Sequence, residues 1–247
     1  MSLLAVEGLS KRFGGVVACD AVTFEVRPGE VHAVIGPNGA GKTTLINQLA
    51  GELASDGGTV RFEDRDISDQ DAPARARLGI ARSFQITSVF REFTALDNAA
   101  LAVQARAGHS FRFFGRAAAD ESLRGPARRA LERTGLGGRA NAPAASLSHG
   151  EQRQLELAMA MATEPRLLLL DEPTAGMGQA DSQRMVALLA SLKGSLAMLL
   201  VEHDMDAVFA LADRITVMTY GRVIATDTPE AIRANAVVRA AYLGTDA

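Results

Sequence analysis

The chain has 247 residues and a formal net charge of −3, and 47% of its residues are hydrophobic and 22% are charged. These values are typical of globular proteins, and they exclude collagen-like, low-complexity and intrinsically disordered chains. The small acidic excess also argues against binding to nucleic acid through overall charge.

The cysteine content indicates a reducing compartment, and the hydropathy gives no sign of a membrane span. The single cysteine, Cys19, cannot form an internal disulfide. No apolar run approaches the roughly 18 consecutive residues that suggest a membrane span, and the N-terminus lacks the order of a signal peptide. We therefore expect a cytosolic chain whose membrane role, if it has one, comes through a partner.

The N-terminal part is predicted to be rich in strands. Short segments with many β-branched residues span Leu4–Glu7, Val22–Val26 and Val31–Ile35. Pro28-Gly29 marks a turn between the last two. A glycine-rich turn then leads into Thr43–Ala50, which has helical composition and ends before Gly51, a residue suited to a helix C-cap. The order of strand, glycine-rich loop and helix is informative, because a phosphate-binding loop requires that context.

The middle of the chain is predicted to change from strand to helix. A second strand-like stretch spans Gly58–Glu63, and a long zone rich in Ala and Arg follows from Leu96 to Leu136. Gly125-Pro126 is expected to divide that zone into at least two helices. The many Arg residues of this region are consistent with a solvated helical surface or with a face for phosphates, lipid head groups or an acidic partner.

The C-terminal half is predicted to alternate strand and helix. Continuous apolar runs typical of parallel strands buried on both faces span Leu167–Leu170, Leu196–Val201 and Ile215–Met218. Helical segments lie between and after them at Gln179–Leu192, Met205–Leu211 and Pro229–Leu243. This alternation predicts an α/β unit with a parallel sheet, in which residues 92–162 form a helical insertion.

A phosphate-binding pattern follows the third predicted strand. Its residues are Gly36-Pro37-Asn38-Gly39-Ala40-Gly41-Lys42-Thr43, the spacing of a P-loop between a strand and a helix. The glycines let successive backbone N–H groups surround a phosphate, and the helix N-terminus adds partial positive charge. We expect Lys42 to reach the β- and γ-phosphates, and the Thr43 hydroxyl to ligate the Mg²⁺ that bridges them.

Two carboxylates close the apolar strand Leu167–Leu170. Asp171 and Glu172 are therefore expected at the carboxyl end of a strand, where open α/β sheets bind ligands. Asp171 is positioned to hold Mg²⁺ through water, and Glu172 to polarise the attacking water as general base. Capping of the next helix is the alternative role for such a pair, but it does not account for the P-loop.

A third motif is Leu147-Ser148-His149-Gly150-Glu151-Gln152. Ser148 and Glu151 have the spacing of a capping box at the start of a helix. Capping alone does not explain Gly150 in the first turn. A capped helix N-terminus is also an anion site, so capping and phosphate binding are compatible.

The order of these motifs, followed by His203, resembles the ATP-binding cassette ATPases over essentially the whole chain. The resemblance implies a P-loop NTPase fold with a parallel-sheet core, an N-terminal antiparallel β subdomain and a helical insertion, all in one domain of residues 1–247. It also implies a dimer with two ATP molecules between subunits, in which Ser148 and Gly150 of one subunit contact the γ-phosphate held by the other.

The same resemblance implies roles for individual residues. Gln85 looks like the family glutamine that touches Mg²⁺ and the water, His203 like the switch histidine that holds the γ-phosphate and Glu172, and Phe13 like the aromatic that stacks on adenine. The implied catalytic residues are Lys42, Gln85, Glu172 and His203, and the implied metal-binding residues are Thr43, Gln85 and Asp171. The implied nucleotide-binding residues are Phe13, Gly36, Pro37, Asn38, Gly39, Ala40, Gly41, Lys42, Thr43, Thr44, Ser148 and Gly150.

Three positions depart from the general family pattern. His149 replaces a glycine and Glu151 a glutamine in the signature motif, and Gly178 stands where many members carry an Asp. Glu151 cannot make the contact of the glutamine's amide. Gly178 cannot make the usual hydrogen bond from that Asp to the opposite P-loop.

A finer resemblance is to the larger ATPase of branched-chain amino acid importers. It is carried by the Ser-His-Gly-Glu-Gln form and by Pro173-Thr174-Ala175-Gly176-Met177, Lys11-Arg12-Phe13-Gly14-Gly15 and Ala241-Tyr242-Leu243-Gly244. It implies a peripheral subunit on the cytoplasmic face of the inner membrane, bound to two polytopic permeases and to a second ABC ATPase or another copy of itself. A binding protein would deliver the substrate, and no nucleic acid is expected.

Several alternatives remain open from the sequence. Related importers take up urea, short amides or aromatic compounds, because the cargo does not contact the ATPase. Soluble cassette ATPases act on nucleic acid or ribosomes, although the long coiled-coil or basic extensions common in them are absent from the sequence. A P-loop GTPase is disfavoured because no Asn-Lys-x-Asp sequence occurs. Phe111, Phe113 and Phe114 could pack against a permease or belong to the core.

Overall fold

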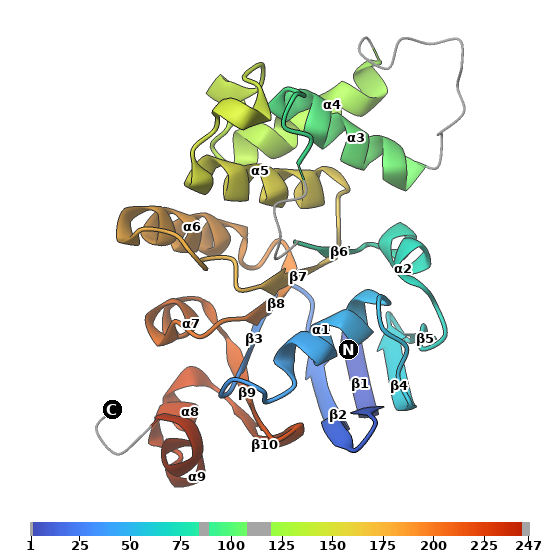
Figure 1. Cartoon of the computed structure of the whole chain (residues 1–247), viewed down its shortest axis with the longest axis vertical. Coiled ribbons are helices and arrows are strands. Elements are labelled where there is room, and N and C mark those ends of the chain that lie inside the picture. Colours follow the sequence, from blue (N-terminus) through green and yellow to red (C-terminus); the bar gives the residue numbers. More distant parts are fainter. Residues whose placement is uncertain (1, 84–88, 108–119, 244–247) are drawn as a thin grey trace.

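The computed structural model describes residues 2–83, 89–107 and 120–243. The described chain has three parts: an N-terminal antiparallel sheet, a larger central sheet and a layer of helices above it (Figure 1). The α/β class, the parallel core, the antiparallel subdomain and the helical layer expected from the sequence are confirmed.

The N-terminal sheet has four strands in the order β2-β1-β4-β5. They are β1 (Leu4–Phe13), β2 (Val16–Val26), β4 (Gly57–Phe62) and β5 (Arg65–Asp66). β1 pairs antiparallel with both β2 and β4, so that Leu4 lies opposite Val26 and Phe62. All three of these side chains are buried. β1 and β2 extend beyond the short apolar segments of the sequence prediction because they pair with each other as far as the hairpin, where Phe13 lies opposite Val16.

The central sheet has six strands in the order β10-β9-β3-β8-β7-β6. They are β3 (Val31–Ile35), β6 (Ile80–Arg82), β7 (Leu167–Asp171), β8 (Ala197–Val201), β9 (Arg214–Thr219) and β10 (Arg222–Asp227). β10 is antiparallel to β9, and the other pairs are parallel. Every residue of β3, β7 and β8 is buried. For β7 and β8 this agrees with the apolar runs Leu167–Leu170 and Leu196–Val201, which predict strands covered on both faces.

Helices cover both faces of this sheet. They include α1 (Lys42–Ala50), α2 (Ala72–Leu78), α6 (Gln179–Leu192) and α7 (Met205–Leu211). One apolar cluster joins α1 to both sheets, because Leu45 and Leu49 pack with Val6 of β1 and Leu169 of β7. The P-loop helix is therefore held between the two sheets, on the side where β3, β7 and β8 end.

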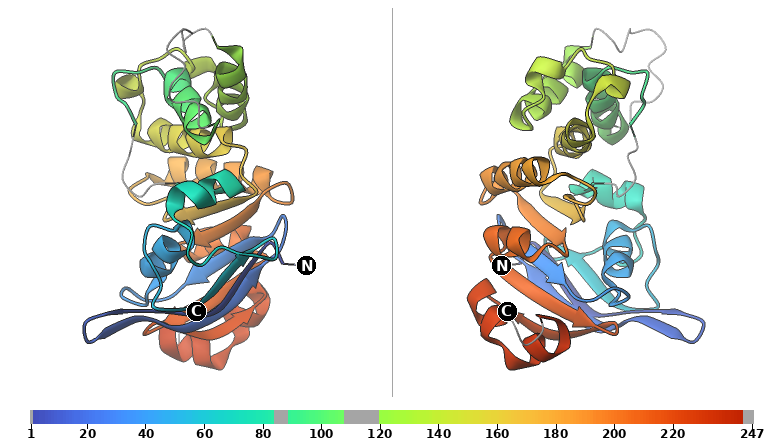
Figure 2. Two further views of the ribbon diagram at one scale, coloured as in Figure 1. Left: turned by 90° about the vertical axis from the view of Figure 1, so that its right-hand side faces the viewer. Right: turned by 60° about the vertical axis from the view of Figure 1, so that its left-hand side comes forward.

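The helical layer consists of α3 (Ala95–Ala107), α4 (Glu121–Arg133) and α5 (His149–Ala162), with short 3₁₀ turns at Gly137–Arg139 and Ala144–Ser146. Both views of Figure 2 place this layer at one end of the molecule, remote from the N-terminal sheet. Its apolar side chains continue the core that contains Leu168 and Leu170 of β7.

The prediction that Gly125-Pro126 separates two helices is wrong. Pro126 lies inside α4, which runs without a break from Glu121 to Arg133. Proline removes only the bond to the Ser122 carbonyl, which lies in the exposed first turn, while Ala127, Ala130 and Leu131 bury the apolar side of the helix. Packing therefore outweighs the cost of the proline.

The C-terminal segment differs from the single helix of the prediction. It forms α8 (Pro229–Ala234), α9 (Ala236–Val238) and a π-helical turn, Arg239–Leu243. Asn235 ends α8 and caps α9, because its side chain accepts hydrogen bonds from the Val237 and Val238 amides. No helix among the described residues is both long and apolar enough to cross a bilayer.

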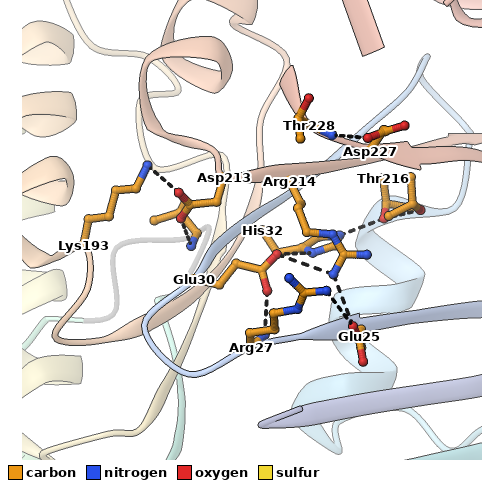
Figure 3. Close-up of polar contacts among 12 residues, drawn as sticks. Glu25, Arg27, Glu30, His32, Lys193, Asp213, Arg214, Thr216, Asp227 and Thr228 are labelled. Atoms are coloured by element: carbon orange, nitrogen blue, oxygen red, sulfur yellow. Dashed lines mark hydrogen bonds and ion pairs between the residues drawn. The ribbon is translucent and has the colours of Figure 1, made fainter. Parts of the chain in front are cut away.

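A polar network lies at the amino ends of β3 and β9 (Figure 3). His32 is fully buried, and its ring nitrogens contact Glu30 Oε1 at 3.4 Å and Thr216 Oγ1 at 2.7 Å. Glu30 also accepts a hydrogen bond of 2.6 Å from the Arg27 amide and faces Arg214 at 3.7 Å. Each buried polar group of this network has a partner, so the network ties neighbouring strands together.

Candidate functional site

The P-loop, Gly36–Thr43, follows β3 and precedes α1, as the sequence predicts. A Cβ atom at Gly36 would lie 2.0 Å from the Met218 carbonyl oxygen, and one at Gly41 would lie 2.0 Å from the Ala18 carbonyl oxygen. Gly41 has a φ of 100°. Only glycine fits these two positions, because the neighbouring strands approach the loop too closely for any side chain.

The loop presents a positive, uncapped helix end. Gly41 is the N-cap of α1 and supplies no side-chain hydrogen bond to the first turn. The Lys42 ammonium donates hydrogen bonds of 2.7 Å and 3.0 Å to the Gly36 and Pro37 carbonyls, which curl around it. Asn38 and Gly39 at the tip, and Thr43 on the first turn, are exposed, whereas Ala40 is buried and Thr44 half-buried. This arrangement suits an anion with several phosphate oxygens.

Asp171 ends β7 beside the P-loop lysine and is 2% exposed. Its Oδ2 accepts a hydrogen bond of 3.1 Å from Arg82, and its Oδ1 is buried with no hydrogen-bond partner among the described residues. Burial raises the pKa of Asp171, and the positive charges of Arg82 and Lys42 only partly offset this effect. Burial also lowers the pKa of Lys42, against the attraction of Glu172 and Asp171.

Arg82 was not anticipated from the sequence. It precedes the Ser83-Phe84-Gln85 segment, and one of its nitrogens binds the Asn47 side chain at 2.7 Å and Glu52 at 2.5 Å, at the end of α1. The other holds Asp171. An Arg at the end of a short strand gave no signal by itself, because its importance depends on partners distant in the sequence.

Glu172 and His203 lie together at the ends of adjacent strands. The His203 Nδ1 is 3.8 Å from Glu172 Oε1, and both side chains reach solvent. Glu172 has a φ of 51°, a left-handed conformation that costs energy for a residue with a Cβ atom, and its amide donates to the Val201 carbonyl at 2.8 Å. The strained turn points a carboxylate outward next to the P-loop.

A second buried carboxylate, Glu202, was also missed as a site residue. It lies directly between β8 and His203 and is 1% exposed. The signal was visible in the sequence, because a charged residue ends an otherwise apolar strand. Its two oxygens accept hydrogen bonds from Thr174, beyond Glu172, and from the backbone of His203.

The signature motif begins α5, in the helical layer. Ser148 and Glu151 form the predicted capping box, since the Glu151 amide donates to Ser148 Oγ at 3.2 Å and the Ser148 amide donates to Glu151 Oε2 at 2.8 Å. A Cβ atom at Gly150 would lie 2.7 Å from the Asp181 carboxylate, so the first turn of α5 packs closely against the first turn of α6. Ser148 and Gly150 are not brought to the P-loop of their own chain, because α5 and α1 lie in different layers (Figure 1).

Other predicted residues have varied surroundings. Phe13, at the tip of the β1–β2 hairpin, is 50% exposed, and the Lys11 ammonium lies 5.7 Å from its ring centre. His149 lies near Gly176, and Gly178 is the N-cap of α6 without a side-chain hydrogen bond. Gln85, Phe111, Phe113 and Phe114 lie outside the described residues.

The comparisons with known proteins agree with this geometry. A family model described as ABC transporter matches residues 19–175, and a model described as branched-chain amino acid ATP-binding cassette transporter matches residues 222–247. The chain is 41% identical over 251 residues to the high-affinity branched-chain amino acid transport ATP-binding protein LivG of Salmonella typhimurium, and 39% identical over 249 residues to BraF of Pseudomonas aeruginosa, with 98% of each chain covered in both cases. A crystal structure of the ADP conformation of an ATP-binding cassette matches with a TM-score of 0.87 at 31% identity, covering 99% of each chain.

Proposed function

The chain belongs to the ABC transporter family of ATP-binding cassettes, and on that premise we propose that it is the ATP-hydrolysing subunit of an importer for branched-chain or related amino acids. The observation that carries the proposal is the meeting of a P-loop lysine, a buried aspartate and a half-buried glutamate at the ends of β3 and β7. The family membership makes the chain an ATPase. The direction of transport and the cargo are the proposal.

Each residue of the site has a task in ATP hydrolysis. Lys42 leaves the Gly36 and Pro37 carbonyls and binds the β- and γ-phosphate oxygens, while the loop amides bind the others. Glu172 accepts a proton from the attacking water, for which its half-buried carboxylate, still open to solvent, is suited. His203 contacts the γ-phosphate and Glu172, Phe13 stacks on the adenine, and Gln85 contacts the attacking water.

The donor groups at the site fit Mg²⁺. The Asp171 Oδ1 is a buried carboxylate oxygen that lacks a hydrogen-bond partner among the described residues, and the Thr43 hydroxyl is exposed on the first turn of α1. Magnesium is usually held by one or two protein oxygens together with water and phosphate. Thr43, Asp171 and Gln85 would hold the ion, which supplies positive charge that neutralises the phosphates.

We propose that the working unit is a dimer of cassettes. Ser148 and Gly150 stand at an N-terminal helix end in the helical layer, away from the P-loop of the same chain (Figure 1). A second ABC ATPase, another copy or a related subunit, would bring its own Ser148 equivalent to this P-loop. Two ATP molecules would then close the two cassettes on each other.

A groove between the helical layer and the edge of the central sheet is the proposed docking place for the permeases. It has a volume of about 400 Å³ and lies among α2, β6, α3, α5 and the end of α1. Its small apolar lining residues are Ala50, Ala72, Ala76, Ala81, Ala102, Ala105 and Ala160. Such a surface admits a helix at close range, and Arg82 on its wall also holds Asp171. Two polytopic permeases would each seat a helix in the groove of one cassette, with a binding protein delivering the cargo to them.

The proposed cargo and the proposed location in the cell rest on the similarity to known transport proteins. The match of residues 222–247 to a branched-chain amino acid cassette model and the similarity to LivG and BraF support that class of amino acid. We further propose that residues 1–247 act as one ATP-binding domain with a helical insertion at about 92–162. The domain would lie on the cytoplasmic face of the inner membrane as a peripheral subunit.

A pull-down from native membranes tests the proposal. Tagged Glu172→Gln protein is solubilised with MgATP, and the chains that co-purify are identified. Two multi-span permeases and a cassette ATPase are expected, and the ligand of the associated binding protein then identifies the cargo. Recovery of ribosomes or nucleic acid without permeases contradicts the importer proposal, and a binding protein for urea, amides or aromatic compounds contradicts only the cargo.

A groove variant sharpens that experiment. Ala76→Arg fills the groove from α2, so the permeases should be lost while ATP binding persists. The matched control is Ala74→Arg, on the same helix but outside the groove lining, which should retain the permeases. Equal recovery of permeases with both variants contradicts the docking place.

A further inference from the structure

Glu202 is a buried carboxylate to which neither the sequence motifs nor the proposed reaction gives a task. It directly follows β8, precedes His203 and is 1% exposed. Glutamate is almost never fully buried without compensation, because removing a charged carboxylate from water is costly. Its hydrogen-bond partners therefore indicate what the residue does.

Each oxygen of Glu202 serves a different segment. Oε1 accepts hydrogen bonds from the Thr174 amide, at 3.0 Å, and from the Thr174 hydroxyl. Oε2 accepts from the His203 amide at 3.0 Å and from the Asp204 amide at 3.5 Å. One side chain thus joins the segment after Glu172 to the loop that carries His203.

The segment that contains Glu172 and Thr174 is strained. Glu172 has a φ of 51°, and a residue with a Cβ atom keeps this conformation only where its surroundings determine it. On its amino side the Glu172 amide donates to the Val201 carbonyl at 2.8 Å. On its carboxyl side, one proline later, Thr174 is held by Glu202. The strained residue is therefore fixed from both directions.

We propose that Glu202 is a positioning residue for ATP hydrolysis: it fixes Glu172 and His203 relative to each other by hydrogen-bonding the Thr174 segment and the His203 loop at once. The inference rests on the proposed roles of Glu172 and His203. Glu202 acts through Thr174 and the backbone of the His203 loop, to which its two oxygens are hydrogen-bonded. Without Glu202, the Glu172 and His203 side chains keep their chemistry but lose the spacing that lets them act on one water and one phosphate.

Glu202→Gln tests the inference with the shape of the side chain retained. An amide offers one oxygen and one NH₂ group, so it can accept hydrogen bonds on one side only. The NH₂ group of the substituted side chain then faces either the Thr174 amide or the His203 and Asp204 amides. Because these backbone groups are also donors, their hydrogen bonds to residue 202 are lost on that side. We expect kcat for ATP to fall about tenfold or more, since small displacements of reacting groups have effects of this size, while the KM and the nucleotide affinity stay within about threefold of the original.

Thr174→Val is a second, milder variant. It removes the hydroxyl bond to Glu202 and keeps the amide bond, so a smaller fall in kcat is expected. The double variant should fall by less than the product of the two single effects, because both act through one contact. Should Glu202→Gln fail to fold, this variant still decides the matter, and an unchanged kcat in it then overturns the proposal.

The matched control is Glu30→Gln at the opposite end of the sheet. Glu30 is 7% exposed and also accepts a backbone hydrogen bond, from Arg27. If Glu202 has only a structural role, Glu202→Gln and Glu30→Gln should both lower the melting temperature. Both should then leave kcat unchanged when it is measured at one temperature well below the melting point of either variant. That result overturns the proposal for Glu202. If Glu172→Gln, measured in parallel on the same chain, keeps full turnover, the proposed role of Glu172 fails instead.

Discussion

The two ends of the central sheet are built for different purposes. At the amino ends of β3 and β9, His32 and Glu30 are buried, hydrogen-bonded on each side and closed off from solvent (Figure 3). At the carboxyl ends of β3 and β7, the chain instead leaves the Asp171 Oδ1 without a hydrogen bond from the described residues and holds Glu172 in a strained conformation. One end is saturated with contacts, and the other keeps groups available for a ligand.

Two buried carboxylates express this difference in their pKa values. Burial alone raises the pKa of Glu30, but hydrogen bonds from His32 and the Arg27 amide outweigh it, so the net shift is downward. Burial also raises the pKa of Asp171, and there Arg82 and Lys42 do not compensate fully, so the net shift is upward. A carboxylate that lacks full compensation in the folded protein is one that gains from a cation.

The largest effect is expected from Glu172→Gln at the carboxyl end. Loss of a general base lowers turnover by about 10²- to 10⁴-fold, while the nucleotide should still bind because the P-loop is intact. Phosphate release and nucleotide titration on the same protein measure the two effects. Steady-state hydrolysis at the original rate would remove Glu172 from its role and weaken the distinction between the two ends.

Lys42→Ala is expected to weaken nucleotide binding by about tenfold to a hundredfold, the size of a lost charged hydrogen bond. Lys42 is 8% exposed, and its ammonium already points into the P-loop, where it donates to the Gly36 carbonyl. Titration with a fluorescent ATP analogue measures the affinity. The matched control is Lys193→Ala at the amino end, where the ammonium pairs with Asp213 at 2.9 Å. Equal losses of affinity in both variants would contradict the assignment.

His32→Ala at the amino end should have the reverse profile. It removes the His32 ring from Glu30, which keeps the Arg27 amide and Arg214, and from the Thr216 hydroxyl, which keeps Thr226. The two lost buried contacts and the space left by the ring cost about 2–3 kcal/mol. For a chain of this length the melting temperature should fall by about 5–10 °C. Scanning calorimetry measures that fall, and kcat at 25 °C should not change. A tenfold lower kcat with an unchanged melting temperature would show that the amino end serves catalysis as well.

The smallest effect concerns acid stability. Because folding lowers the pKa of Glu30 below its usual 4.5, its carboxylate stabilises the fold above that pH, and this contribution is lost as the pH falls through the folded pKa. Glu30→Gln should therefore be less stable than the original at neutral pH, and the difference should shrink under acid conditions. Urea unfolding of the two proteins at neutral and at acid pH measures the difference in stability. A difference that grows in acid would contradict the downward direction of the Glu30 pKa shift.

The sequence was informative where local patterns decide the structure. The P-loop, the strand before Asp171, the capping box of Ser148 and the bounds of the helices Gln179–Leu192 and Met205–Leu211 follow from spacing and hydrophobicity alone. The short edge strand β6 and the antiparallel β10 did not, because the pairing of an edge strand depends on neighbours distant in the chain.

The missed site residues share that cause. Arg82 and Glu202 matter through contacts with Glu52, Asp171 and Thr174, which lie 28 to 89 positions away. No local spacing encodes such partners, although a charged residue directly after an apolar strand does mark Glu202 in the sequence. Pro126 was misjudged for the related reason that its helix is held by packing of its buried side rather than by its own propensity.

Hydrogen–deuterium exchange with and without MgATP tests the difference between the two ends most directly. The account predicts that the nucleotide protects the amides of the P-loop and of the segments after β7 and β8, and leaves those around His32 and Thr216 unchanged. Protection centred on the amino ends of β3 and β9, or none at the P-loop, would contradict it.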